Sequence, residues 1–444
     1  MLIHHIQLHM NPKATTLFSR AWLFHLFYFL IMLLCSCRQS DFGAGHLFRA
    51  TSAETVSSPT AYDFDQDGRL EIVIGSFDEN CYMLDDSLRD LAGWPQSCPG
   101  GFFSSPALWD VDRDRTPEIF IGGNDGKFYG WHFEGALVPG FPIDLGFQCW
   151  SSPMIVADSL IAIGGYEKMF LFDRHGRAAA HWPQALNGWA SASAAWHDDL
   201  LTISTLTRGE TSRGYLYAWH LSGKPYPNFP LRLKMDSDSS PVLADVDNDG
   251  KMEIIVGDDG GFLHVFKLDG SELQPFPRLV GEAIQGSVAI ADLNQDDILD
   301  FVFGTTDGAI HVWNAIGDCA LGWPVRTGHE INGSPALVEI ENGEWHIVIG
   351  SGDHRLYVLH PEGKNEEGFP VDCGEAIYSS PLVIDLDGNG RREIVVGANN
   401  GIHLFEDVLP PSPVQSRALE WNMFRQNPQR TGTLPNSLSF RRIL

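Results

Sequence analysis

A repeat of about 47 residues runs through most of the chain and restricts its fold more than any other feature. The residue after a leading serine recurs in steps of 47, 47, 41, 47, 47, 47 and 46 residues. These anchor positions are Pro59, Pro106, Pro153, Ala194, Pro241, Val288, Pro335 and Pro381. A second marker, an aromatic residue followed by proline, keeps the same register at Trp94, Phe141, Trp182, Phe229, Phe276, Trp323 and Phe369. Two independent markers in one register predict eight copies of one structural unit.

The unit is clearest between Ser239 and Pro277. Three short apolar runs, Val242–Ala244, Ile254–Val256 and Phe262–Lys267, are rich in β-forming residues and bounded by Gly, Asp or Asn. Such runs indicate strands rather than helices. A fourth extended piece surrounds Phe276, where the following proline suits an edge strand. Four short strands in about 40 residues correspond to one blade of a β-propeller. The fold class is therefore all-β, an eight-bladed propeller with four strands per blade.

An acidic loop lies between the first two strands of this unit. The segment Asp245–Glu253 places acids at positions 1, 3, 5 and 9, and Gly250 supplies a turn that other residues resist. Several carboxylates and the Lys251 carbonyl can surround one hard cation, and calcium accepts six to eight oxygens in flexible geometry. An EF-hand would require its closing Glu at position 12, where Val256 stands. The segment predicts a strand-to-strand calcium loop.

The same loop recurs in five of the eight repeats. Repeats one, five and eight keep the glycine, whereas Arg115 and Asp297 replace it in repeats two and six. Repeats three, four and seven have lost the loop, and Glu339–Gly343 is only a remnant. The pattern predicts three strong calcium sites and two further ones. The predicted ligands are Asp63, Asp65, Asp67, Glu71, Asp110, Asp112, Asp114, Glu118, Asp245, Asp247, Asp249, Glu253, Asp292, Asn294, Asp296, Asp300, Asp385, Asp387, Asn389 and Glu393.

A D-x-D-x-D-G-x-x-E loop that runs into Ile-Val-Val-Gly resembles the FG-GAP/VCBS repeat of integrin α-chains and many bacterial surface proteins. The resemblance covers roughly Val56 to Phe405 and implies a calcium-binding propeller. It implies little about activity, because propellers of this type carry many functions. Asp and Asn also favour ordinary turns. Five loops in one register argue against that simpler interpretation.

The amino-terminal region has the features of an export signal. Basic residues precede the apolar run Ala21–Leu34, which is too short to span a bilayer comfortably, and the first acid is Asp41. Leu34–Cys37 resembles a bacterial lipoprotein box, which predicts lipid on Cys37 and a periplasmic or cell-surface location. The alternatives are a plain secretory signal cut nearby and translation from Met10.

The expected organisation has four parts. They are a signal peptide at 1–36, a tether at 37–45, the propeller at 46–417 and a carboxy-terminal tail at 418–444. A propeller must close its ring, and His46–Thr51 can supply the missing strand of the last blade. Trp421–Phe424 is the alternative source of that strand. Trp421–Gly432 also resembles a segment that follows the last repeat in other secreted proteins of this group, and we expect it to pack on the propeller.

Charge and cysteine content limit the partners. The chain has 57 acidic and 30 basic residues, a net charge of −27, and 18 of the acids are among the predicted calcium ligands. Such a surface repels phosphate backbones, which argues against nucleic acid. We expect a monomer that binds a protein or a glycan and meets the membrane only through its lipid. Beyond the signal, Cys81 and Cys98 are candidates for a disulfide, with buried free thiols as the alternative.

No catalytic signature accompanies the fold. Ser/His/Asp constellations, H-E-x-x-H and G-x-S-x-G are absent from the sequence. The recurrent aromatic residues favour packing between blades over a ligand groove. We therefore predict a non-enzymatic, calcium-stabilised binding or adhesion scaffold. The alternatives are a lyase acting on pectic polysaccharides and, more remotely, a quinone-dependent dehydrogenase, although the T-G-x-x-x-W signature of quinoprotein propellers is missing.

Overall fold

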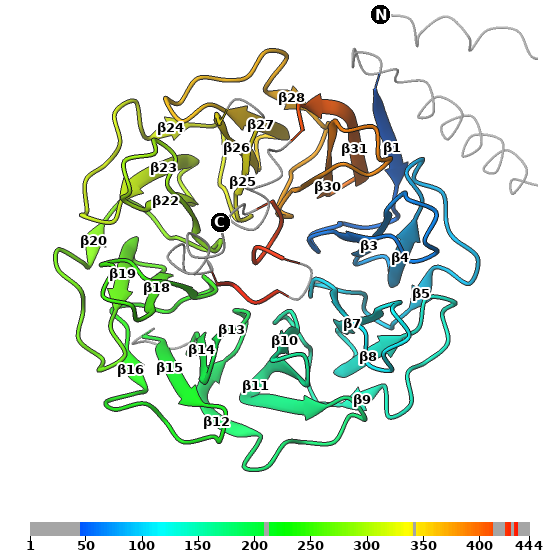
Figure 1. The fold of residues 1–444 in the computed structure, drawn as a ribbon, viewed down its shortest axis with the longest axis horizontal. Helices are drawn as coiled ribbons and strands as arrows, with labels where there is room; N and C mark the ends of the chain where they lie inside the picture. Colours follow the sequence, from blue (N-terminus) through cyan, green and yellow to red (C-terminus); the bar gives the residue numbers. More distant parts are fainter. Residues whose placement is uncertain (1–44, 208–212, 341–342, 412–421, 428–429, 434–444) are drawn as a thin grey trace, which may run out of the picture. The chain divides into compact units, whose positions relative to one another are not determined.

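The computed structural model describes residues 45–207, 213–340, 343–411, 422–427 and 430–433. Within these residues, 31 strands form eight antiparallel sheets arranged as the blades of a ring (Figure 1). Seven sheets have four strands, and blade three has the order β10-β11-β12. The chain is therefore an eight-bladed β-propeller, as the repeat predicted.

Each repeat contributes its strands from the centre of the ring outward. The first strands are β2 (Thr60–Tyr62), β6 (Ala107–Trp109), β10 (Met154–Val156), β13 (Ala195–His197), β17 (Val242–Ala244), β21 (Ala289–Ala291), β25 (Ala336–Glu339) and β29 (Leu382–Ile384). The second strands are β3 (Glu71–Gly75), β7 (Glu118–Gly122), β14 (Leu200–Ser204), β18 (Glu253–Gly257), β22 (Asp300–Gly304), β26 (Trp345–Gly350) and β30 (Arg392–Ala398).

The third strands are β4 (Asn80–Leu84), β8 (Lys127–Trp131), β15 (Tyr215–His220), β19 (Phe262–Phe266), β23 (Ala309–Asn314), β27 (Arg355–Leu359) and β31 (Gly401–Leu409). The outer strands are β5 (Gln96–Ser97), β9 (Ile143–Asp144), β12 (Gln184–Trp189), β16 (Leu231–Arg232), β20 (Arg278–Leu279), β24 (Val325–Arg326), β28 (Val371–Asp372) and β1 (His46–Ala50). In blade three, β11 (Leu160–Asp173) takes the place of the second and third strands.

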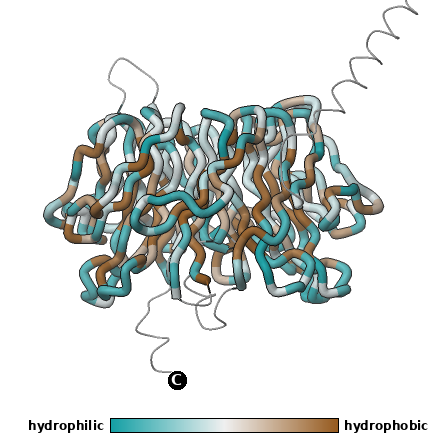
Figure 2. The backbone as a smooth tube through the Cα atoms, turned by 90° about the horizontal axis from the view of Figure 1, so that it is seen from above, coloured by the Kyte–Doolittle hydropathy of each residue, from teal (hydrophilic) through white to brown (hydrophobic). Residues whose placement is uncertain are grey.

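The hydrophobic core lies between neighbouring blades. Second strands are buried on both sides, which explains their continuous apolar runs: β18 is buried along its whole length. One apolar cluster joins Ile255, Phe303 and Ile349 from three successive blades. In side view, hydrophobic residues concentrate in the strands and hydrophilic residues in many of the loops at both rims (Figure 2).

The aromatic markers fasten each blade to the next. The indole N–H of Trp94 donates to the carbonyl of Phe133 at 2.6 Å, and that of Trp182 to the carbonyl of Leu221 at 2.9 Å. Both indoles are buried. Where the marker is Trp, it therefore combines apolar packing with a hydrogen bond across the blade interface, as expected for a buried Trp.

The amino-terminal strand closes the ring. β1 pairs with β31 from His46 opposite Phe405 to Ala50 opposite Gly401, so the last blade joins both ends of the propeller. The His46 and His403 rings stack and their nitrogens lie 3.0 Å apart. Burial lowers the pKa of His403 to about 3 and that of His46 to about 4. Of the two sources considered for the closing strand, the structure uses the amino-terminal one.

The five cysteines of the propeller are free thiols, four of them buried and Cys319 exposed. The disulfide considered between Cys81 and Cys98 is therefore not formed. Among the described residues no helix is long and apolar enough to cross a membrane. The signal, the tether and Cys37 lie outside the described residues.

Candidate functional site

The two faces of the propeller carry different kinds of residue. Loops between first and second strands, which include the acidic loops, emerge on one face, named here the loop face. Because consecutive strands are antiparallel, the segments entering the first strands and the loops between second and third strands emerge on the opposite face. This second face is named the channel face, because it surrounds the mouth of the central channel.

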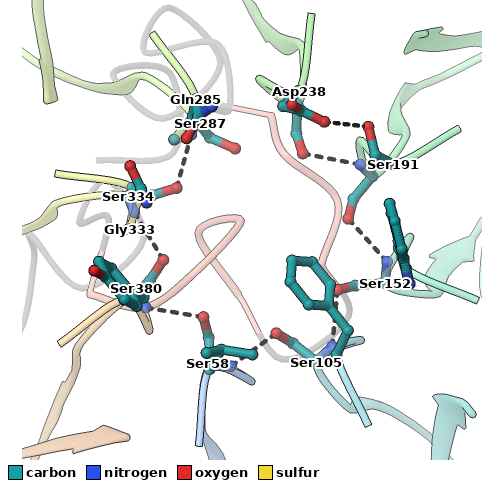
Figure 3. Close-up of a pocket in the computed structure, with 18 of the residues that line it drawn as sticks. Ser58, Ser105, Ser152, Ser191, Asp238, Gln285, Ser287, Gly333, Ser334 and Ser380 are labelled. Atoms are coloured by element: carbon teal, nitrogen blue, oxygen red, sulfur yellow. Dashed lines mark hydrogen bonds between the residues drawn. The ribbon is translucent and has the colours of Figure 1, made fainter. Parts of the chain in front are cut away.

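A ring of serines surrounds the channel (Figure 3). The backbone N–H of one leading serine donates to the hydroxyl oxygen of the next at 2.8–2.9 Å, and the contact from Ser380 to Ser58 closes the circle. Seven such bonds join the eight described serines, and the remaining acceptor, Ser287 Oγ, is buried without a partner. The leading serine of the repeat is therefore a structural link between blades.

The residue two positions before each leading serine lines a cavity of about 740 Å³ at the channel mouth. These eight residues are Val56, Phe103, Trp150, Ser191, Asp238, Gln285, Asn332 and Tyr378. The serines are constant, whereas the neighbouring position differs in every blade. This contrast between repeats is visible in the sequence, but only the closed ring brings the eight positions to one cavity.

One side of the cavity is aromatic. The Phe77 and Phe103 ring centroids lie 6.1 Å apart, and the Phe103 and Trp150 centroids lie 5.9 Å apart. The series continues outward through Trp189, 5.9 Å from Trp150, and Tyr166, 5.1 Å from Trp189. Phe103 is 42% exposed. The rings offer flat apolar faces to a ligand.

The opposite side is polar and acidic. Ser191 donates to Asp238 at 2.6 Å, and Asp259 stands close by. Burial, followed by repulsion from Asp238, Asp236 and Asp258, raises the pKa of Asp259 to about 7. Asp259 Oδ1 and Asn332 Oδ1 are buried acceptors without a hydrogen-bond partner. This side can therefore accept hydrogen bonds from a ligand.

The tail packs two buried arginines into the channel. Arg425 donates to the carbonyls of Pro241 and Ala194 in blades five and four. Arg430 donates to carbonyls of Pro106, Ser58 and Pro59 in blades two and one. Burial lowers the pKa of both guanidinium groups to about 9, so both stay charged at neutral pH. Phe424, in the same segment, lines the cavity.

On the loop face, the acidic loop of blade five is arranged like a cation site. Ligand atoms of Asp245, Asp247 and Glu253 lie within 4.8 Å of one another. The N–H of Gly250 donates to Asp245 Oδ2 at 3.0 Å, and the N–H of Val246 donates to Glu253 Oε2 at 2.9 Å. Asp245 is 7% exposed and its Oδ1 is buried without a partner. The backbone thus holds one oxygen of Asp245 and one of Glu253, and Asp245 Oδ1 is left for a cation. Asp247 Oδ2 pairs instead with Lys267 Nζ at 2.5 Å.

The three complete loops differ from the two altered ones at the first aspartate. Asp63 and Asp385, like Asp245, leave Oδ1 buried and unpartnered. In the altered loops both oxygens of Asp110 and of Asp292 accept backbone N–H groups. The glycine position has positive φ in every loop, and there Arg115 (83°) and Asp297 (66°) adopt a conformation that favours glycine. The complete loops thus leave one oxygen of the first aspartate for a cation, whereas the backbone occupies both oxygens in the altered loops.

The remaining predicted ligands lie in the same loops. Burial, together with the neighbouring aspartates, raises the pKa of Glu71, Glu253 and Glu393 to about 7 and that of Asp300 to about 6. Such crowding of carboxylates is relieved by a bound cation. An all-oxygen set of this kind suits calcium. The residues present therefore fit the ion that the sequence predicted.

Comparison with known proteins gives the fold and the repeat. Residues 245–303 match the model of the FG-GAP-like repeat. No curated protein matches the chain. Similar solved structures include the computationally designed Ika8 protein (13% identity, TM-score 0.55, covering 81% of this chain and 98% of that one). BamB from Moraxella catarrhalis has 17% identity and a TM-score of 0.52, covering 80% and 97%. A europium-containing methanol dehydrogenase has 11% identity and a TM-score of 0.58, covering 81% and 92%. At such identities the likeness concerns the fold alone.

Proposed function

Since the chain is an eight-bladed β-propeller that carries an FG-GAP-like repeat, we propose that it is an exported, calcium-stabilised binding scaffold that takes a glycan at its channel mouth. The observation that carries the proposal is the ring of eight differing residues beside eight constant serines. Constant positions join the blades, and the differing positions give the cavity its chemistry. The loop face supplies stability and the channel face supplies recognition.

A glycan fits the cavity better than a protein surface does. The volume of about 740 Å³ lies in the ~300–1,000 Å³ range of small-ligand sites. Sugar rings present C–H faces that pack on aromatic side chains such as Phe103 and Trp150. Their hydroxyl groups would donate to the unpartnered oxygens of Asp259 and Asn332. A protein partner remains the second candidate ligand.

We assign the calcium loops a structural role. They lie on the face opposite the cavity, and their closing acid lies at the start of the second strand of the blade, as Glu253 begins β18. A cation there joins the first strand to the second and removes repulsion between the carboxylates. Binding to the folded state alone stabilises it by mass action.

We assign the membrane anchor to Cys37. Lipid adds ~0.8 kcal/mol per buried methylene, and stable anchoring takes more than one chain. The variant Cys37→Ser should move the protein from the membrane fraction to the soluble fraction and abolish fatty-acid labelling. Unchanged labelling in this variant would remove the lipid from the proposal.

The binding proposal is tested with a glycan and protein array probed in calcium. Trp150→Ala should reduce binding of the selected glycan by at least tenfold, because the ring lines the cavity. Phe48→Ala is the matched control, since Phe48 is an exposed aromatic residue on the outer strand β1. Equal losses in the two variants, or no glycan bound by the wild-type chain, would contradict the proposal.

The enzymatic alternative concerns the same cavity. Its described lining contains no Lys, Arg or His to act as the base of a pectic lyase, but Asp259 has a pKa suited to proton transfer. Incubation with pectic polysaccharides, followed by absorbance near 235 nm, detects the unsaturated ends that a lyase produces. Their formation, and its loss in Asp259→Asn, would make the scaffold a lyase. Electron transfer to a dye in the presence of a quinone tests the remoter dehydrogenase alternative.

A further inference from the structure

Blade seven lacks the acidic loop but carries two histidines and a glutamate close together on the loop face. His346 lies in β26, and His360 and Glu366 follow β27. His346 Nε2 lies 2.9 Å from Glu366 Oε2, and His360 Nε2 lies 3.0 Å from the same oxygen. One potential ligand atom from each residue lies within 4.8 Å of the other two.

The strand register gives His346 a specific counterpart in the other blades. Val338 of β25 pairs with His346, as Ala244 of β17 pairs with Glu253 in blade five. Blade one shows the same pairing between Tyr62 and Glu71. Blade seven therefore has a histidine at the position where the calcium loops have their closing glutamate.

The contacts of this cluster converge on one carboxylate oxygen and leave one ring nitrogen without a partner. His346 has a side chain that is 2% exposed, and its Nδ1 is buried without a partner. Both Nε2 atoms approach a single oxygen of Glu366, although His346 lies in β26 and His360 follows β27. The two ring centroids lie 4.7 Å apart.

An outer contact orients one of the rings. His360 Nδ1 lies 2.8 Å from Glu344 Oε1. Histidines that bind metals generally donate their second ring N–H to a carboxylate or carbonyl, which fixes the tautomer and directs the other nitrogen at the metal. His360 shows this arrangement, with Nε2 facing Glu366.

From these observations we propose that His346, His360 and Glu366 form a transition-metal site of the zinc class, in place of the calcium site that blade seven has lost. Two imidazoles and one carboxylate suit Zn²⁺ and its first-row neighbours, whereas calcium takes oxygen ligands. His360 and Glu366 are partly exposed, with 24% and 29% of their side chains accessible, so solvent can complete the coordination. The site is independent of the glycan cavity, which lies on the opposite face.

The cluster around His132 in blade two provides a contrast. His132 Nδ1 lies 3.0 Å from Glu118, and Asp112 completes that group. It has one histidine instead of two and shares its acids with a predicted calcium loop. Only a site with two nitrogens should prefer zinc in the presence of excess calcium.

The test uses the mature chain without a histidine tag, stripped with EDTA and then saturated with calcium. Equilibrium dialysis against zinc chloride should show one bound equivalent that millimolar calcium does not displace. His360→Gln and Glu366→Gln should each weaken zinc binding more than tenfold and leave the calcium-dependent melting temperature unchanged. Glu344→Gln should weaken it by about 10- to 100-fold as an outer partner.

The control is His311→Gln, because His311 is a buried histidine outside the cluster. It should retain full zinc binding. Cobalt substitution supplies a second readout, since nitrogen ligation gives an intense visible band that the His360 variant should lack. Zinc that calcium displaces, zinc retained by both ligand variants, or no bound equivalent in the wild-type chain would overturn the proposal.

Discussion

The loop face and the channel face arise from the same eight repeats but use them in opposite ways. On the loop face the same acids recur at the same positions, and blades differ mainly by losing them. On the channel face the serine stays while the residue two positions earlier changes in each blade. Under the proposed function, sameness between repeats serves the structure, whereas variation beside a constant position serves recognition.

The largest expected effect comes from Arg430, a buried residue of the tail that donates to carbonyls of two blades. Arg430→Met leaves carbonyl groups of two blades buried without donors, at a cost on the order of 3 kcal/mol. Thermal unfolding should show a fall of several degrees in calcium and in chelator alike, and glycan binding should weaken too. Arg326→Met is the control, because the Arg326 side chain is 62% exposed. A normal melting temperature for Arg430→Met would show that the tail does not hold the ring together.

A second, smaller effect should distinguish the loop face from the channel face, because it changes stability without changing glycan binding. Asp245→Asn with Asp249→Asn removes one complete loop, worth ~2.7 kcal/mol at a hundredfold excess of calcium over its dissociation constant. The melting temperature should fall in calcium but hardly in EGTA, and glycan affinity should stay unchanged. The paired substitutions Asp292→Asn and Asp296→Asn should matter less, since the backbone already occupies both oxygens of Asp292. Equal effects of the two pairs would refute the proposed order of strength.

The last predicted effect is a dependence of stability on pH, to which the loop face and the channel face contribute separately. Glu71, Glu253 and Glu393 have their pKa raised to about 7, so without metal the folded chain binds more protons than the unfolded chain between about pH 4.5 and 7. Stability therefore falls as pH rises through this window, by at most ~1.4 kcal/mol per pH unit for each proton. Bound calcium keeps these carboxylates ionised, so it should abolish their contribution to the pH dependence of stability.

Asp259 on the channel face makes the second contribution to the pH dependence of stability. Its pKa is also raised to about 7, and it lies away from the acidic loops, so its contribution should persist in calcium. Asp259→Asn should remove the pH dependence that persists in calcium and leave the effect of calcium on stability unchanged. Melting curves from pH 5 to 8, with and without calcium, measure the contribution of the loop glutamates and that of Asp259. A calcium-independent pH profile would contradict the assignment of the loops.

Much of the fold could be predicted from the sequence, because blades are local units. The four strands of one blade lie within about 40 residues, so apolar runs and turn residues identify them directly. The acidic loops are local as well, and their spacing predicted which aspartates come together. The closing strand could be narrowed to two candidates, but the choice of His46–Ala50 depends on pairing with β31, more than 350 residues away.

The sites that the sequence analysis missed depend on distant contacts. Trp150 and Asp238 come from different repeats and face one cavity only because the ring closes. The sequence feature that could have identified these two residues is the variable position two residues before each constant serine. His346 was missed for another reason. The loop of repeat seven is one residue shorter, so only the strand pairing shows that the histidine lies opposite Val338.

The account gives stability to the loop face and recognition to the channel face. The most direct test of this account is the melting temperature of the wild-type mature chain in calcium and in EGTA. The account predicts a melting temperature several degrees higher in millimolar calcium, because five acidic loops lose their internal repulsion when the cation binds. Superimposable melting curves in the two buffers would contradict it, since the loops would then be acidic turns that do not bind calcium.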